Sequence, residues 1–178
     1  MSKKHLNSLI LSALFLALAY ILPFFTGNIP QIGSMLLPMH IPVLLCGFVC
    51  GAPWGLAVGM IAPVMRSVLT GGFPPMFPTA VAMAFELATY GFVAGFFSRH
   101  LTKNLRGTYT TLLVSMLCGR VVWGFVMALL TLNASSFSLA VFVAGAFTNA
   151  IPGIILQLVA IPAIVIAVRK TAKSPVEV

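Results

Sequence analysis

The sequence predicts an all-α integral membrane protein of six transmembrane helices with cytoplasmic N- and C-termini. Of its 178 residues, 60% are apolar and only 7% are charged, and the mean hydropathy is +1.10. A soluble domain of this size cannot bury so much apolar surface. Six spans of ~20 residues use nearly the whole chain and leave no room for a soluble domain. The third observation is the placement of the basic residues.

The basic residues indicate how the chain crosses the membrane. Eight of the ten Lys and Arg residues lie in three short clusters, at 3–5, 99–106 and 169–173. Segments 26–38, 71–78 and 132–144 contain none. Under the positive-inside rule the clusters are cytoplasmic and the uncharged segments face outward. The net charge of +8 therefore reflects membrane orientation and gives no reason to expect nucleic acid as a partner.

The first expected span covers residues 6–25. Its basic start, its apolar run and Ala17-Leu18-Ala19 are similar to a secretory signal, whose cleavage would leave five spans. The apolar run continues to residue 22 without a polar break, so we expect the segment to be retained. Residues 26–38 mix turn formers with apolar side chains, which predicts a gating loop that folds back over the bundle.

Residues 39–70 are expected to form two short spans, 39–51 and 53–70, of about 16 residues or ~24 Å each. A single crossing would place the basic cluster at 99–106 outside the cell, against the positive-inside rule. Gly51-Ala52-Pro53 supplies the turn between them, since proline is tolerated in the first turn of a helix. Glycines recur every four residues and allow close helix contact: Gly47, Gly51, Gly55 and Gly59.

Residues 71–78 hold three prolines and two glycines, so a second non-helical gating loop is expected there. The remaining spans are expected at 79–98, 109–131 and 145–168. All six belong to a single membrane domain covering residues 1–178.

Neither a metal site nor a catalytic centre is indicated. Cys46, Cys50 and Cys118 lie in apolar runs without a second CxxC or a nearby His pair, which predicts buried, reduced thiols. The chain has no GxSxG, HExxH or Walker A motif. We therefore expect a protein that is not an enzyme, does not hydrolyse ATP and uses no cofactor.

Glu86 is the most informative residue, because the only other acidic residue is Glu177 in the polar tail. An ionised carboxylate within a membrane span costs roughly 2.5–3.5 kcal/mol or more, so it normally faces a cavity or a partner. Glu86 and Arg120 lie about 10 Å and 16 Å below the outer ends of their helices. They are predicted to meet each other or one bound molecule. A structural ion pair that only holds two helices together remains the alternative.

Other candidate binding residues also fall in the outer half of the expected bundle. Arg66 has the alternative of snorkelling to the outer interface, and His40 that of an interfacial histidine. Trp123 lies one turn from Arg120 and either stacks on a ligand ring or packs. The amides at 149 and 157 either contact a ligand or tie helices together. The full set is Gln31, His40, Arg66, Glu86, Tyr90, Arg120, Trp123, Asn149 and Gln157.

Two stretches carry a resemblance to a known family. GSMLLPMHIPVLLCGFVCGAPWGLAVGMIAPVMRSVL and FPTAVAMAFELATYGFVAGFF resemble the substrate-binding S component of energy-coupling factor (ECF) vitamin transporters. The resemblance covers nearly the whole chain.

The resemblance implies a bacterial plasma-membrane protein that captures a vitamin from outside with high affinity. Its partners would be an ECF transmembrane subunit and two ATPase subunits, on which it docks and topples within the lipid bilayer. The family's small-residue docking contact corresponds to Ala13 and Ala17, and its gating loops to 26–38 and 71–78. The site would be built mainly from the last three helices and these loops.

Several alternatives remain open on the sequence. Pantothenate suits Arg120 through its carboxylate, whereas a pyridoxine-type vitamin suits stacking on Trp123 with a hydrogen-bonding acid. A stand-alone secondary carrier would use Glu86 as an ion-coupling carboxylate and should show two related halves, although no repeat is visible. A structural scaffold of a membrane assembly would have no use for a buried acid.

The first prediction tests the topology. In a cysteine-free background, Pro30→Cys, Pro75→Cys and Ser135→Cys should react with an impermeant thiol reagent added outside, whereas Lys103→Cys and Lys173→Cys should not. Outside labelling at position 103 would make residues 39–70 a single crossing and contradict the six-span arrangement.

Overall fold

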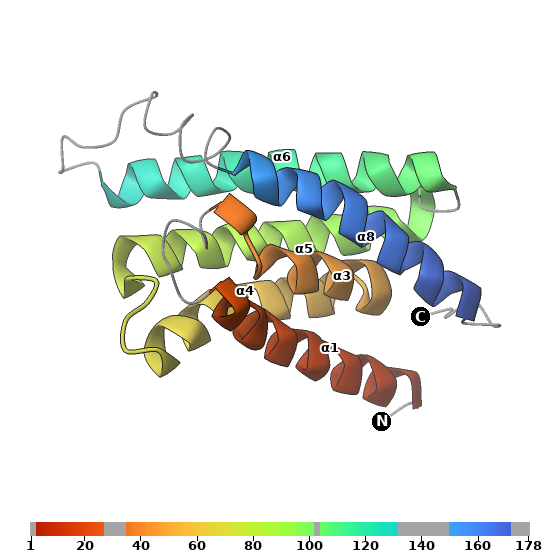
Figure 1. The fold of residues 1–178 in the computed structure, drawn as a ribbon, viewed down its shortest axis with the longest axis horizontal. Helices are drawn as coiled ribbons and strands as arrows, with labels where there is room; N and C mark the ends of the chain where they lie inside the picture. Colours follow the sequence, from red (N-terminus) through yellow and green to blue (C-terminus); the bar gives the residue numbers. More distant parts are fainter. Residues whose placement is uncertain (1–2, 27–34, 102–103, 132–149, 172–178) are drawn as a thin grey trace.

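The computed structural model describes residues 3–26, 35–101, 104–131 and 150–171, and their regular structure is helical (Figure 1). Five of the described helical stretches are long and apolar enough to cross a membrane, while His40–Cys50 is shorter. The elements are α1 (Lys3–Ile21), a 3₁₀ turn (Leu22–Thr26), α3 (His40–Cys50), α4 (Ala52–Leu69), an irregular turn (Met76–Ala80), α5 (Val81–Leu101), α6 (Leu105–Leu130) and α8 (Ile151–Thr171).

The short helix α3 is where the structure departs most from the expected spans. It has 11 residues, or ~16 Å at 1.5 Å per residue, about half of a ~30 Å hydrocarbon core. Met39 and His40, at its start, are already buried. Gly51 joins it to α4 with φ of 94°, a conformation that glycine adopts without strain. Helix α3 therefore begins inside the bundle and not at its surface.

The exposed basic residues of the described helices lie at one end of the bundle. The start of α1, the end of α5, the start of α6 and the end of α8 lie at the same end of the bundle (Figure 1). A Cβ added to Gly51 would lie 3.1 Å from the Arg99 guanidinium, so the α3–α4 turn is there too. We call this the basic end, since it holds Lys3, Arg99 and Arg106. The connection at 71–75 lies at the opposite end.

The connection between α4 and α5 is partly helical, where a loop is expected over 71–78. Gly71 and Gly72 form the turn with φ of 72° and 96°. Helical backbone resumes at Met76, three residues earlier than predicted, but Phe77 within this turn is extended (φ −121°, ψ 134°). Regular helix begins only at Val81. The prolines therefore distort this segment without keeping all of it out of the helix.

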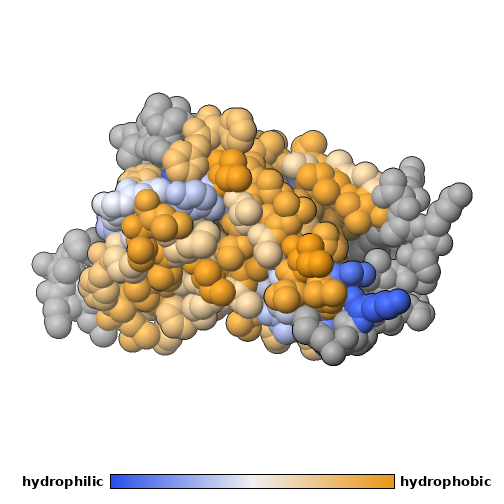
Figure 2. All heavy atoms as spheres, turned by 90° about the horizontal axis from the view of Figure 1, so that it is seen from below, coloured by the Kyte–Doolittle hydropathy of each residue, from blue (hydrophilic) through white to orange (hydrophobic). Residues whose placement is uncertain are grey.

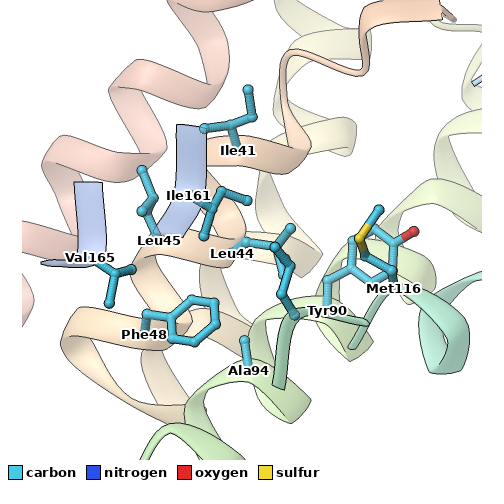
Figure 3. Close-up of a cluster of buried hydrophobic side chains, with 10 residues drawn as sticks. Ile41, Leu44, Leu45, Phe48, Tyr90, Ala94, Met116, Ile161 and Val165 are labelled. Carbon is cyan, nitrogen blue, oxygen red and sulfur yellow. The ribbon is translucent and has the colours of Figure 1, made fainter. Parts of the chain in front are cut away.

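Buried apolar side chains from four helices meet in one cluster (Figure 3). Helix α3 runs through its middle, and α5, α6 and α8 surround it with Tyr90, Met116 and Ile161. A second cluster joins α1 and α4 to the other side of α3 and to Leu87 of α5. The fold therefore has its core around the shortest helix.

Glycines set the distance between α4 and α5. A Cβ added to Gly91 would overlap the Gly55 carbonyl, and one added to Gly59 would overlap the Leu87 carbonyl. Gly47 of α3 faces the Gly91 carbonyl as well. The four-residue glycine pattern thus brings three backbones into direct contact, as expected for small residues in membrane helices.

The surface of the bundle is largely apolar, and its most hydrophilic residues gather at the basic end (Figure 2). Large apolar side chains such as Phe25, Val121 and Phe125 are exposed, as lipid-facing residues are. The prediction of buried thiols is confirmed for Cys46 and Cys50 but wrong for Cys118, which is exposed. Cys118 lies between exposed Leu117 and buried Gly119 on α6, so an apolar run alone does not separate lipid-facing from core positions.

The glycine contact generates the second prediction. Gly91→Val should lower the free energy of unfolding by about 3 kcal/mol, the upper end for overpacking, because the new side chain meets backbone that cannot rotate away. Thermal unfolding in detergent measures the change. Ala163→Leu adds the same number of carbons at an exposed position of α8 and should have little effect. Equal stability of the two variants would show that the helices separate without cost.

Candidate functional site

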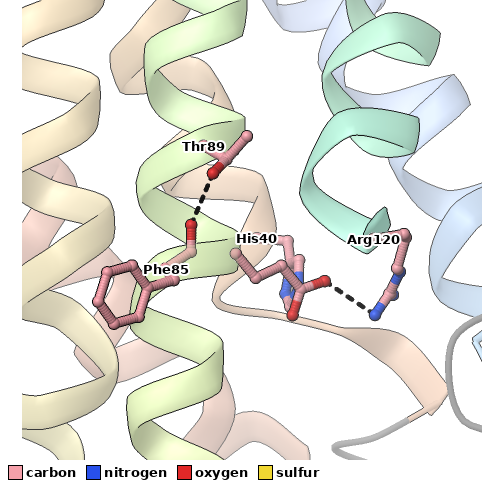
Figure 4. Close-up of polar contacts among 5 residues, drawn as sticks. His40, Phe85, Thr89 and Arg120 are labelled. Carbon is pink, nitrogen blue, oxygen red and sulfur yellow. Dashed lines mark hydrogen bonds and ion pairs between the residues drawn. The ribbon is translucent and has the colours of Figure 1, made fainter. Parts of the chain in front are cut away.

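Glu86 and Arg120 form an ion pair inside the bundle. Glu86 lies in the second turn of α5 with 1% of its surface exposed, and Arg120 of α6 is 6% exposed. Arg120 Nη1 is 2.9 Å from Glu86 Oε1 (Figure 4). A Cβ on Gly119 would overlap the Tyr90 ring, so this glycine lets α6 approach α5 beside the pair. Of the two outcomes expected from the sequence, the structure shows the first: the two side chains are in direct contact.

His40 brings a third helix to the same carboxylate. It is the first residue of α3, and its Nε2 is 3.5 Å from Glu86 Oε1. This is an electrostatic contact and too long for a good hydrogen bond. The imidazole also meets the Tyr90 ring edge-on at 5.3 Å between centroids. With 2% exposure it is no interfacial histidine, so that alternative is wrong.

The pair neutralises itself electrically. Two opposite charges in contact offset much of the cost of removing each from water, whereas removal of one partner leaves the other uncompensated, typically at ~3–5 kcal/mol. The side chains of Glu86 and Arg120 come from different helices, so their contact also ties α5 to α6. Geometry alone is therefore compatible with both interpretations made from the sequence.

Gln157 of α8 lies at the same level as this pair. Leu44, Tyr90, Met116 and Ile161 share one buried cluster, and we call these four residues the apolar layer. Each has a polar residue four positions away along its helix, in the direction away from the basic end. Because residues four apart share a helix face, each of these polar side chains projects from the same face of its helix as the neighbouring residue of the apolar layer. We call them the polar layer: His40, Glu86, Arg120 and Gln157.

The chain also covers the polar layer on its α8 side. Gly153 lies one turn beyond Gln157, away from the apolar layer, and a Cβ there would lie 2.6 Å from the Met35 carbonyl oxygen. The backbone of residues 35 and 36 therefore packs directly on α8. Both residues belong to the segment expected to form the first gating loop, of which residues 27–34 lie outside the described residues.

Arg66 occupies a separate place near the opposite end. It is 3% exposed and therefore packed within the bundle. Its guanidinium carbon lies 5.6 Å from the Phe24 ring centroid and 5.9 Å from that of Phe73, within cation–π range. Arg66 thereby connects the turn that follows α1 to the connection after α4.

Of the three remaining predicted site residues, one falls within the part of the chain that the structure describes. Trp123 is half-buried, one turn from Arg120 on α6. Gln31 and Asn149 lie outside the described residues. Within the described ranges no group of three His, Cys, Asp or Glu residues could hold a metal ion.

Sequence reasoning missed the buried face of α6 next to the site. Thr111 and Ser115 are fully buried, and Ser115 Oγ donates a hydrogen bond to the Thr111 carbonyl at 2.7 Å. The signal was present as small residues at four-residue spacing, which runs from Thr111 through Ser115 to Gly119. Such a stripe predicts close helix packing, and here it faces α5.

Fold and site together define a helical membrane protein with a charge-compensated polar site inside its bundle. The model of the family described as "ECF transporter, substrate-specific component" matches residues 7–165, and the chain belongs to this family. Comparisons with curated proteins and with solved structures gave no match. The chain is therefore a membrane-embedded substrate-binding component that works with an ECF module, and members of this family are transport proteins and not enzymes.

The third prediction separates a ligand site from a structural pair. Glu86→Ala and Arg120→Ala should each weaken binding of the vitamin that most stabilises the wild type by at least about tenfold, or ~1.4 kcal/mol. Arg106→Ala, which removes an exposed charge at the basic end, should leave affinity unchanged.

The structural alternative gives a different result in the same double-mutant cycle. Each single substitution would lower thermal stability, the double substitution would restore part of it, and affinity would not change.

Proposed function

We propose that the protein is the high-affinity binding subunit for uptake of a vitamin or related micronutrient from outside the cell. Transport would be powered by ATP hydrolysis in a separate ECF module of one transmembrane subunit and two ATPases. The observation that carries this proposal is the polar layer, in which an ion pair and two further polar side chains are buried inside the bundle. We further propose that both termini are cytoplasmic and that the membrane is the plasma membrane of a bacterium.

The apolar layer supports a binding subunit that needs a partner for transport. Leu44, Tyr90 and Ile161 are at most 1% exposed and Met116 is 7% exposed. Together they close the side of the polar layer that faces the basic end. A polar molecule held at Glu86 would have to pass through this packed layer to reach the cytoplasm. Movement of the whole component on a partner avoids that barrier.

The polar layer fits both candidate ligands named from the sequence. The carboxylate of pantothenate would bind Arg120, and Gln157 would hydrogen-bond its amide or hydroxyl groups. A pyridoxine-type ring would stack near Trp123 and hydrogen-bond Glu86 or His40. Tyr90, in the apolar layer, would contact the ligand from the side that faces the basic end.

Helix α1 offers the docking face. Ala13 and Ala17 are exposed. Only 22% of the apolar stretch of this first span is buried inside the bundle, the lowest share among the candidate spans of the described residues. The helix instead packs through Ser8, Ser12 and Ala19. The two alanines are therefore free to contact helices of the ECF transmembrane subunit at short distance.

The secondary-carrier alternative is less well supported. An ion-coupling carboxylate must exchange its partner for a proton or Na⁺ during each cycle. Glu86 is already held by Arg120 at 2.9 Å, which disfavours such an exchange. A scaffold protein would not require the polar layer at all.

The fourth prediction tests binding and energy coupling together. The purified chain alone should be stabilised against heating by one vitamin at micromolar concentration, because a ligand that binds only the folded state raises its stability. In cells, accumulation should require the ECF module. Ala13→Trp combined with Ala17→Trp should abolish uptake and change affinity less than about twofold, or ~0.4 kcal/mol.

Ala163→Trp, at an exposed position of α8, is the matched control and should preserve uptake. Loss of binding together with uptake in the double variant would refute the docking assignment. Accumulation by the chain alone on an ion gradient would establish a secondary carrier.

A further inference from the structure

The polar layer has hydrogen-bonding groups left over after its internal contacts are made. Both amide atoms of Gln157, both ring nitrogens of His40 and the Nη2 of Arg120 are buried and have no hydrogen-bond partner among the described residues. Buried polar atoms are nearly always hydrogen-bonded in folded proteins. A side-chain amide offers a donor and an acceptor side by side. These atoms therefore define the hydrogen bonds that a ligand can make.

The two charges of the layer, in contrast, already neutralise each other. Glu86 carries one negative and Arg120 one positive charge, and their contact of 2.9 Å leaves no net charge. An anionic ligand that approached Arg120 would also approach the Glu86 carboxylate, and the two effects oppose each other. A cationic ligand would meet the same conflict at Arg120. The interior gives little solvent screening to either.

We propose that the polar layer selects ligands without net charge that present a hydrogen-bond donor and acceptor side by side to Gln157 and an acceptor to Arg120. This inference rests on the proposed function and narrows it. It favours a pyridoxine-type ligand, which is electrically neutral at pH 7, over pantothenate, which carries a carboxylate. The ion pair then serves to cancel charge at the site.

The test compares ligands that differ in charge but hardly in shape. Pantothenol replaces the carboxylate of pantothenate by an alcohol, and 4-pyridoxate is the carboxylate form of pyridoxine. Affinities of the full chain in detergent are measured by titration calorimetry at pH 7. Within the pair that binds, the neutral member should bind at least about tenfold tighter than the anion, or ~1.4 kcal/mol.

Glu86→Gln should reverse this preference. The substitution keeps the shape of the side chain and leaves Arg120 as an uncompensated positive charge, so the anionic member should gain at least about tenfold relative to its neutral analogue. Glu177→Gln removes the only other acidic side chain in the sequence and should leave the preference unchanged.

The outcomes separate the inference from the function on which it rests. Tighter binding of the anion by the wild type would overturn the inference and leave the proposed function intact. An unchanged preference in Glu86→Gln would also overturn it, because the ion pair would then not set the selectivity. Should Glu86→Gln fail to fold, the wild-type comparison alone decides. Absence of any stabilisation by these four compounds and a wider vitamin panel would overturn both.

Discussion

The structure depends on keeping one carboxylate and one guanidinium together in an apolar bundle. Glu86 and Arg120 belong to helices that are adjacent along the chain and run in opposite directions (Figure 1). Their 2.9 Å contact requires α5 and α6 to approach closely, which Gly119 permits by leaving room for the Tyr90 ring. His40 and Gln157 belong to the same polar layer as this pair. The pair thus joins α5 to α6 and, through His40, to the start of α3.

Much of this arrangement is readable from the sequence, because the bilayer imposes simple rules on composition. The helical class follows from hydropathy, and the meeting of Glu86 and Arg120 follows from their depths. The burial of His40 and Arg66 could not be predicted in this way. It depends on where α3 starts and on the rings of Phe24 and Phe73, which are tertiary features. The exposure of Cys118 is of the same kind, because apolar side chains occupy both lipid-facing and core positions in a membrane protein.

The short helix α3 explains why polar and apolar residues form separate layers. It begins at His40 and ends at Cys50, so its side chains fill only the part of the bundle nearest the basic end. The apolar cluster around Leu44 occupies that part. Beyond His40, no α3 side chain is available, and residues 35–39 turn across the space toward Gly153 of α8. A longer helix at this position would fill the level at which the polar layer lies.

The glycine contacts between α4 and α5 restrict how the molecule can change shape. Sliding of one helix along the other would drive neighbouring side chains into the backbone carbonyls that Gly55, Gly59 and Gly91 accommodate. Packed interiors resist continuous deformation of this kind, so a shear motion between these two helices is strongly disfavoured. We therefore expect the two helices to move as one rigid body, so that conformational change takes place by rotation of that body in the bilayer or by displacement of less tightly packed elements against it.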